Sequence, residues 1–171
     1  METLETSDMQ GLIVRGYSEH VAARYFMLKI TDANAAKAWL AGMINVISPG
    51  KPKPGDIAVN IAFTFPGLTA LGLAPLKPHA NFSPEFLSGM VEEHRSRTLG
   101  DTDQNAPAAW EWGGPSDPVD LVLMVFAKVQ LLLDASYPAD MSFADHGMNL
   151  VKALETSDLG GFEQFGFHDG I

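Results

Sequence analysis

The sequence contains no cysteine. This absence excludes disulfide bonds, thiolate catalysis, cysteine-ligated zinc and iron–sulfur clusters held by cysteine. Basic residues are also scarce, because 11 lysines and arginines stand against 21 aspartates and glutamates, a formal net charge of −10. We therefore expect neither a nucleic acid nor an anionic membrane as partner, since both need a basic face. A locally basic groove for a small anion is still compatible with this balance.

The sequence also has no long apolar run. Its longest apolar stretch, Leu121 to Ala127, is far shorter than the roughly 20 residues that span a bilayer. The acidic opening METLETSDMQ is unlike a secretory signal, so a cytoplasmic location is the default expectation. With 171 residues, 46% hydrophobic and 19% charged, the composition is that of one soluble globular domain over residues 1–171.

Hydrophobic periodicity and breaker residues divide the chain into alternating strands and helices. Apolar residues that alternate or run continuously predict strands over 23–30, 56–65, 119–127 and 147–156, although the spacing over 147–156 would also support a helical turn or two. Helical spacing and N-capping residues predict helices over 32–48, 66–73 and 83–100, and a fourth that starts at 128 and stops before Pro138.

The order of these elements indicates an α+β domain of the ferredoxin-like βαββαβ type. Such a domain has an antiparallel sheet with helices on one face, and here a long insertion (74–118) separates the second and third strands. The third strand is apolar on both faces, so we expect it to be central and covered on both sides. A second layer should then bury the face of the sheet that the helices leave open.

Five stretches of sequence together resemble the dye-decolorising peroxidase (DyP-type) family over nearly the whole chain. They are DMQGLIVRGY, NIAFTFPGLTALGL, FSPEFLSGM, PAAWEWGG and FEQFGFHDGI. The last contains a GxxDG motif, Gly166-Phe167-His168-Asp169-Gly170, and the chain ends one residue later at Ile171. The resemblance covers only about the N-terminal half of a family member. Taken alone, GxxDG is also compatible with a turn in which Asp169 accepts hydrogen bonds from nearby backbone N–H groups.

The resemblance implies a haem b enzyme that oxidises dyes and other bulky aromatic substrates with hydrogen peroxide. It gives Asp169 the role of distal acid/base, and places Gly166, Phe167, His168, Gly170 and Ile171 against the cofactor. Peroxide cleavage needs a base that removes one proton and returns it to the departing oxygen. Flanking glycines would let the backbone approach a flat ring closely. Free aspartate, with a pKa of about 3.9, stays ionised in moderately acidic solution, which predicts acid-tolerant turnover.

In the family, the proximal histidine and the distal arginine both follow GxxDG, so no residue of this chain can take either role. The other histidines, His20, His79, His94 and His146, are expected in loops or on solvated faces, and we assign no metal ligand. Trp39 is expected on the apolar side of a helix, and Trp110 and Trp112 are expected to pin the insertion rather than to transfer electrons.

Two main functional hypotheses remain open. The first is the N-terminal half of a peroxidase, inactive unless a C-terminal half or a second copy completes it. The alternative is a non-catalytic binding or assembly module that forms a sheet-to-sheet homodimer. A small dimeric α+β-barrel enzyme, of the monooxygenase or chlorite-dismutase kind, rests on fold analogy alone. Under all three readings we expect a homo-oligomer or a partner chain.

Overall fold

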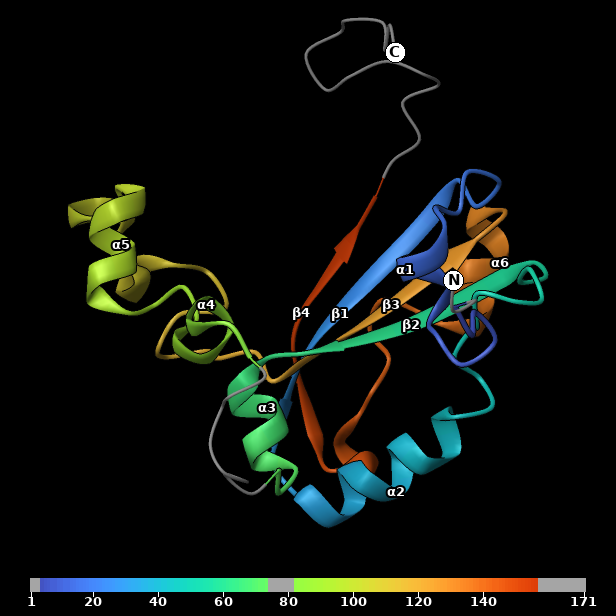
Figure 1. Ribbon diagram of the computed structural model, residues 1–171, viewed down its shortest axis with the longest axis horizontal. Helices are drawn as coiled ribbons and strands as arrows, with labels where there is room; N and C mark the ends of the chain where they lie inside the picture. The colour runs from blue at the N-terminus through green and yellow to red at the C-terminus, as the bar shows by residue number, and fades with distance from the viewer. Residues whose placement is uncertain (1–3, 74–81, 157–171) are drawn as a thin grey trace, which may run out of the picture.

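The computed structural model describes residues 4–73 and 82–156, and its centre is one four-stranded antiparallel sheet (Figure 1). The strand order is β2-β3-β1-β4. The strands are β1 (Ala22–Ile30), β2 (Ile57–Phe63), β3 (Leu121–Ala127) and β4 (Met148–Glu155). This order confirms the predicted ferredoxin-like fold, with β1 and β3 in the middle and the long insertion between β2 and β3.

Two helices cover one face of the sheet. Helix α2 (Ala33–Met43) starts at Asp32, whose carboxylate accepts from the backbone N–H groups of Asn34 and Ala35. Helix α6 (Gln130–Ser136) contacts both central strands. Between helices and sheet lies the core, where Phe26, Leu123 and Ile61 form one row across three strands. Within the predicted helix 32–48, Ala36 and Met43 are buried as expected. The helix ends at Met43 rather than at 48, and Ile44, which was expected on the apolar side, is exposed.

The opposite face of the sheet is only partly covered by the residues that the structure describes. Tyr17 packs on Phe126 with ring centroids 4.9 Å apart, and its hydroxyl donates to Asn60 Oδ1 at 2.7 Å. The neighbouring side chains Tyr25, Val122 and Met124 stay half-buried. We call this the open face. The predicted central position of β3 is confirmed, and its two sides differ in cover among the described residues: side chains toward the helices are fully buried, and those toward the open face are only partly buried.

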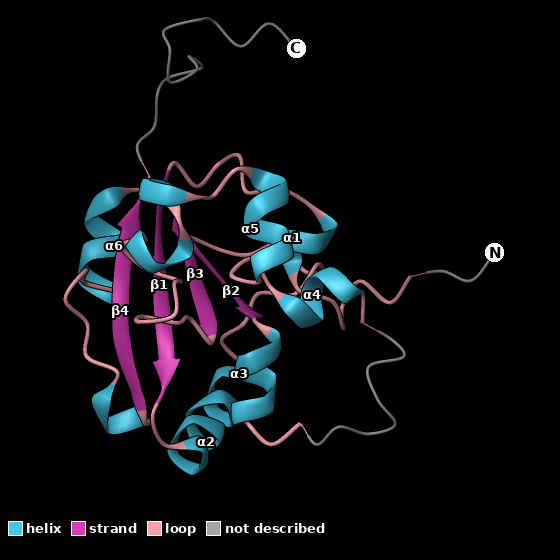
Figure 2. Ribbon diagram, turned by 90° about the vertical axis from the view of Figure 1, so that its left-hand side faces the viewer, coloured by secondary structure: helices cyan, strands magenta, loops and turns pink. Residues whose placement is uncertain are grey.

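The insertion holds several short helices instead of the single helix predicted over 83–100 (Figure 2). Helix α3 (Phe65–Ala70) precedes the insertion and follows β2 directly, with Pro66 in its first turn as predicted. Helix α4 (Pro84–Ser88) stops at Gly89, whose φ of +67° requires glycine, and α5 (Glu93–Leu99) begins after it. Two 3₁₀ turns, Asp103–Asn105 and Pro107–Ala109, complete the segment. Apolar residues spaced four apart, as in one continuous α-helix, continue across Gly89. Hydrophobic periodicity alone could therefore not reveal that the helix ends there.

Helix α3 is fixed to the start of β3 by a close approach at Gly67. A methyl group at this position would overlap the carbonyl oxygen of Asp120. We expect Gly67→Ala to lower the free energy of unfolding by about 2–3 kcal/mol, because backbone must move to relieve the overlap. Gly42→Ala is the control: it lies exposed in α2 with open space around its Cβ, and should raise stability by about 0.5 kcal/mol. Urea unfolding of both variants measures this, and equal effects would contradict it.

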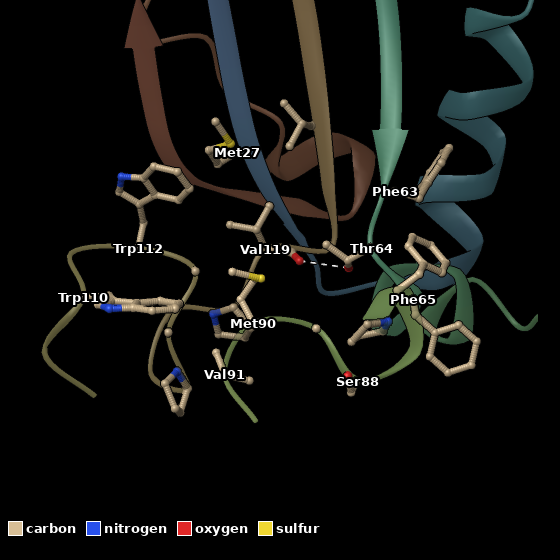
Figure 3. A pocket seen from close by; sticks show the side chains of 18 of the residues that line it. Met27, Phe63, Thr64, Phe65, Ser88, Met90, Val91, Trp110, Trp112 and Val119 are labelled. Atoms are coloured by element: carbon tan, nitrogen blue, oxygen red, sulfur yellow. Dashed lines mark hydrogen bonds between the residues drawn. The ribbon is translucent and has the colours of Figure 1, made fainter. Parts of the chain in front are cut away.

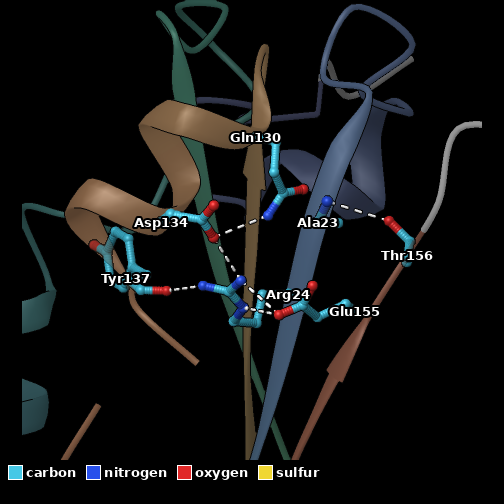
Figure 4. Close-up of polar contacts among 7 residues, drawn as sticks. All are labelled: Ala23, Arg24, Gln130, Asp134, Tyr137, Glu155 and Thr156. Carbon is cyan, nitrogen blue, oxygen red and sulfur yellow. Dashed lines mark hydrogen bonds and ion pairs between the residues drawn. The ribbon is translucent and has the colours of Figure 1, made fainter. Parts of the chain in front are cut away.

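A buried arginine ties α6 to the sheet (Figure 4). Arg24, in the middle of β1, is only 2% exposed, and its guanidinium bonds Asp134 at 2.7 Å and Glu155 at 2.6 Å. It also donates to the carbonyl oxygen of Tyr137. Burial acts to lower the pKa of Arg24, but the hydrogen bonds to the two carboxylates outweigh it and raise the pKa. The hydrogen bond that Arg24 donates to Asp134 lowers the pKa of this carboxyl group, and a smaller contribution from the bond donated by Gln130 lowers it further.

Candidate functional site

A large pocket lies where the insertion crosses one end of the open face (Figure 3). It encloses about 820 Å³. Met27 and Val122 of the sheet form its floor, and the end of β2 with the start of α3 forms one wall. The other walls come from the α4 region, including Met90, and from the loop that carries Trp110 and Trp112. We call this the aromatic pocket.

Contacts within the chain hold the α3 and α4 walls in place. Thr64 caps α3, and its hydroxyl donates toward the carbonyl oxygens of Val119 and Asp120 at 3.0 and 3.1 Å. In the α4 wall, Arg95 bonds Glu85 at 3.2 Å and donates to Ser88 Oγ at 3.0 Å. Phe65, Phe82 and Phe86 contact one another with ring centroids 5.1 to 6.2 Å apart. Polar bonds and ring contacts therefore fix this side of the pocket before any ligand binds.

The tryptophan loop is held from both sides as well. Trp110 Nε1 donates to the carbonyl oxygen of Asn105 at 3.0 Å, a local bond within the insertion itself. Gly114 lies so close to the carbonyl of Pro107 that a side chain would not fit. Glu111 forms an ion pair with Lys152 of β4, so the loop is tied across the open face to the far edge of the sheet.

The pocket is apolar inside, and its ionisable lining residues are both acidic. Glu85 and Glu111 line it, and no histidine, lysine or arginine is among its described lining residues. A hydrogen bond from its own backbone N–H, then bonds from Arg95 and Ser83, lower the pKa of Glu85. Such walls suit the face of a flat apolar ring. They do not fit the iron of a haem or its two carboxylates, because no described lining residue offers an imidazole or a cation.

The residues that the sequence placed at a cofactor lie outside the described part of the chain. These are Gly166, Phe167, His168, Asp169, Gly170 and Ile171, and His79 falls outside it too. Of the other histidines, His94 is exposed on α5, and the ring of His146 lies 6.1 Å from Trp39. Trp39 packs against the core as predicted. No group of three potential metal ligands occurs among the residues that the structure describes, and within them no helix is long and apolar enough to cross a bilayer.

A second, smaller pocket of about 320 Å³ lies between the loop after α1 (Gly11–Val14) and the connector before β2. Arg15, His20 and Lys53 line it, together with the acidic Glu19. Arg15 donates to the carbonyl oxygen of Gly50, and His20 Nε2 lies 3.2 Å from that of Gly55. Arg15 Nε and His20 Nδ1 are buried and have no hydrogen-bond partner among the described residues, so neither faces open space in the pocket.

Comparison with known proteins adds sequence and fold evidence. No model of a known protein family matches the chain. The dye-decolorizing peroxidase msp1 of Mycetinis scorodonius is 29% identical, over 98% of this chain but 33% of its own length. A crystal structure of a DyP-type peroxidase from Auricularia auricula-judae superposes with a TM-score of 0.75 and 23% identity, covering 99% of this chain and 38% of that one. A DyP-type peroxidase from Anabaena gives a TM-score of 0.73 at 17% identity, over 88% and 34% of the two chains.

These matches bear on the family resemblance and on its extent. The chain spans only 33% of the length of the curated relative that it matches. The structural matches show the shared ferredoxin-like fold, and the sequence match shows that the likeness extends beyond the fold. The resemblance to the dye-decolorising peroxidases is thereby confirmed: in sequence and in fold, this chain is similar to one part of a member of that family.

Proposed function

We propose that this chain is the N-terminal half of a haem-dependent DyP-type peroxidase that oxidises dyes and other bulky aromatic substrates with hydrogen peroxide. The observation that carries the proposal is the match of almost the entire chain to a single part of such an enzyme. A C-terminal half would supply the proximal histidine and the distal arginine. Alone, these 171 residues are inactive in this proposal.

Asp169 is the distal acid/base in this proposal. Haem, when bound, supplies the redox chemistry with peroxide. Asp169 removes a proton from the peroxide hydroxyl and returns it to the oxygen that leaves as water, so the carboxylate is unchanged after the cycle. Gly166 and Gly170 would permit close approach of the backbone to the cofactor, and Phe167, His168 and Ile171 would help to hold it.

The open face supports the docking of a second half. Tyr25, Met124 and Phe126 are half-buried there, and the adjacent Leu154 of β4 continues the apolar surface. A second layer on this face would remove these side chains from water, which is favourable by about 25 cal/mol per Å² of apolar surface. The aromatic pocket would lie at one end of the same interface.

A chimera tests the proposal. The matching part of the Mycetinis scorodonius peroxidase is replaced by this chain, and the purified chimera is compared with the isolated chain. We expect haem uptake with a Soret band and peroxide-dependent dye bleaching by the chimera, and neither by the isolated chain. A folded chimera without haem would contradict the proposal. Tight five-coordinate haem in the isolated chain would contradict the assignment of the axial ligand to the other half.

The open face also favours the second candidate, a non-catalytic module that forms a sheet-to-sheet dimer. Two copies related by a two-fold axis would bury the same half-buried side chains against each other. Light scattering of the isolated chain separates the two functions. A colourless dimer of the isolated chain, together with a chimera that takes up no haem, assigns the chain to this class.

A further inference from the structure

The aromatic pocket has the size and the lining of a small-molecule site. Its volume of about 820 Å³ falls within the roughly 300–1,000 Å³ that is usual for ligand pockets. Trp110 and Trp112 lie on one side and Phe65 on the other, with Met90 between them in the view of Figure 3. Phe86 also lines the pocket. Two opposed aromatic walls complement a flat ring system better than a bulky aliphatic ligand, because stacked and edge-on ring contacts add to simple burial.

The charges at the rim select among flat ligands. Glu85 and Glu111 line the pocket, whereas their partners Arg95 and Lys152 do not. The whole chain carries a net charge of −10, which adds to the repulsion of anions. Tryptophan faces in addition attract cations by cation–π interaction. An anionic ring would therefore lose its hydration on entering the pocket without gaining a cationic partner there. An uncharged ring has no charge to dehydrate, and a positively charged ring is attracted by the carboxylates and the tryptophan faces.

From the walls and the charges together, we propose that the aromatic pocket binds a flat aromatic molecule that is uncharged or positively charged, and discriminates against anionic ones. The walls are fixed by bonds within this chain, so the site is formed without a second half and without haem. The inference does not depend on peroxidase activity, and it would stand if the chain were a binding module.

Three probes with one ring system and different charges test this inference: 2-naphthylmethylammonium, 2-naphthylmethanol and 2-naphthoate, titrated calorimetrically into the isolated chain at neutral pH. We expect the cation and the alcohol to bind, and the carboxylate to bind about tenfold more weakly, equivalent to about 1.4 kcal/mol. Trp112→Ala should weaken the binding of the alcohol by about tenfold, because one ring contact and its buried apolar area are lost. Trp39→Phe is the matched control and should bind like the parent, because Trp39 packs against Phe143 in the core.

Charge selection is tested separately, in case Trp112→Ala disturbs the loop. Glu111→Gln removes one negative charge from the lining and the carboxylate partner of Lys152 beside it, so the ratio of cation to carboxylate affinity should fall by about threefold or more while the alcohol is unaffected. Glu93→Gln, an exposed carboxylate paired with Arg97 on α5, should leave the ratio unchanged. Equal affinity for all three probes overturns the inference, and so does equal weakening by Trp39→Phe and Trp112→Ala. Absence of binding of all three probes overturns it too, whether the chain is a monomer or a dimer.

Discussion

Replacing Asp169 by alanine in the haem-loaded chimera is expected to lower kcat/KM for hydrogen peroxide by about 10²- to 10⁴-fold, the range for loss of a positioned general acid/base. The haem content and the Soret band should stay as in the parent chimera, because a distal carboxylate does not ligate the iron. Stopped-flow mixing with peroxide isolates this step from dye oxidation. The predicted loss therefore appears in the reaction with peroxide and not in the binding of the dye.

Two further variants separate a chemical role of Asp169 from a structural one. Asp169→Glu keeps a carboxylate and should recover part of the activity, whereas Asp169→Asn, of the same shape, should be as slow as alanine. Asp145→Ala removes an exposed carboxylate from the 3₁₀ turn Ala144–His146 and serves as the matched control. If Asp169→Asn retains full activity with peroxide, the carboxylate is not the base, and the reading of Asp169 as a turn residue is preferred.

The strands and the topology could be predicted because they depend on local patterns. Ile57, Val59 and Ile61 occur at every second position, which places them on one face of β2. The order of the elements along the chain then restricts the fold to very few arrangements. The open face could be predicted only in part. Apolar residues on both sides of β3 indicate that something covers each side, but they do not say how completely or by which segment.

The aromatic pocket was not predicted, because long-range contacts assemble it. Glu111 and its partner Lys152 are 41 residues apart, and Met27 meets Trp112 only once the insertion crosses the sheet. The available signal was the density of aromatic residues in FSPEF and WEW. We interpreted the two tryptophans as pinning the insertion, and FSPEF as the start of a helix and part of the family resemblance. The break at Gly89 also mattered, since a continuous helix over 83–100 would not form the α4 wall. The roles of Asp169 and its neighbours remain predictions from the family resemblance.

The role of Arg24 also depends on long-range contacts that the sequence does not reveal. Its removal should have the largest effect on stability. In sequence it is one polar residue in an apolar strand, while its partners Asp134 and Glu155 lie 110 and 131 residues further along the chain. The structure buries its side chain between α6 and the sheet, where the guanidinium satisfies three acceptors from two elements. Both carboxylates are about half exposed, at 52% and 49%, so water can hydrate them when the arginine is lost.

Arg24→Ala is expected to lower the free energy of unfolding by about 3 kcal/mol, from the lost packing of a long buried side chain and the lost charge-assisted hydrogen bonds. Arg24→Met retains most of the buried volume and should cost about half as much, so the difference between the two variants measures the packing contribution. The control is Arg97→Ala, which removes an exposed ion pair with Glu93 on α5 and should cost under about 0.5 kcal/mol. Urea unfolding at neutral pH measures all three. A buried ion pair is screened less by solvent and salt than a surface pair, so its removal should cost more free energy of unfolding. A loss in Arg24→Ala no larger than that in Arg97→Ala would therefore mean that the guanidinium does not hold α6 to the sheet.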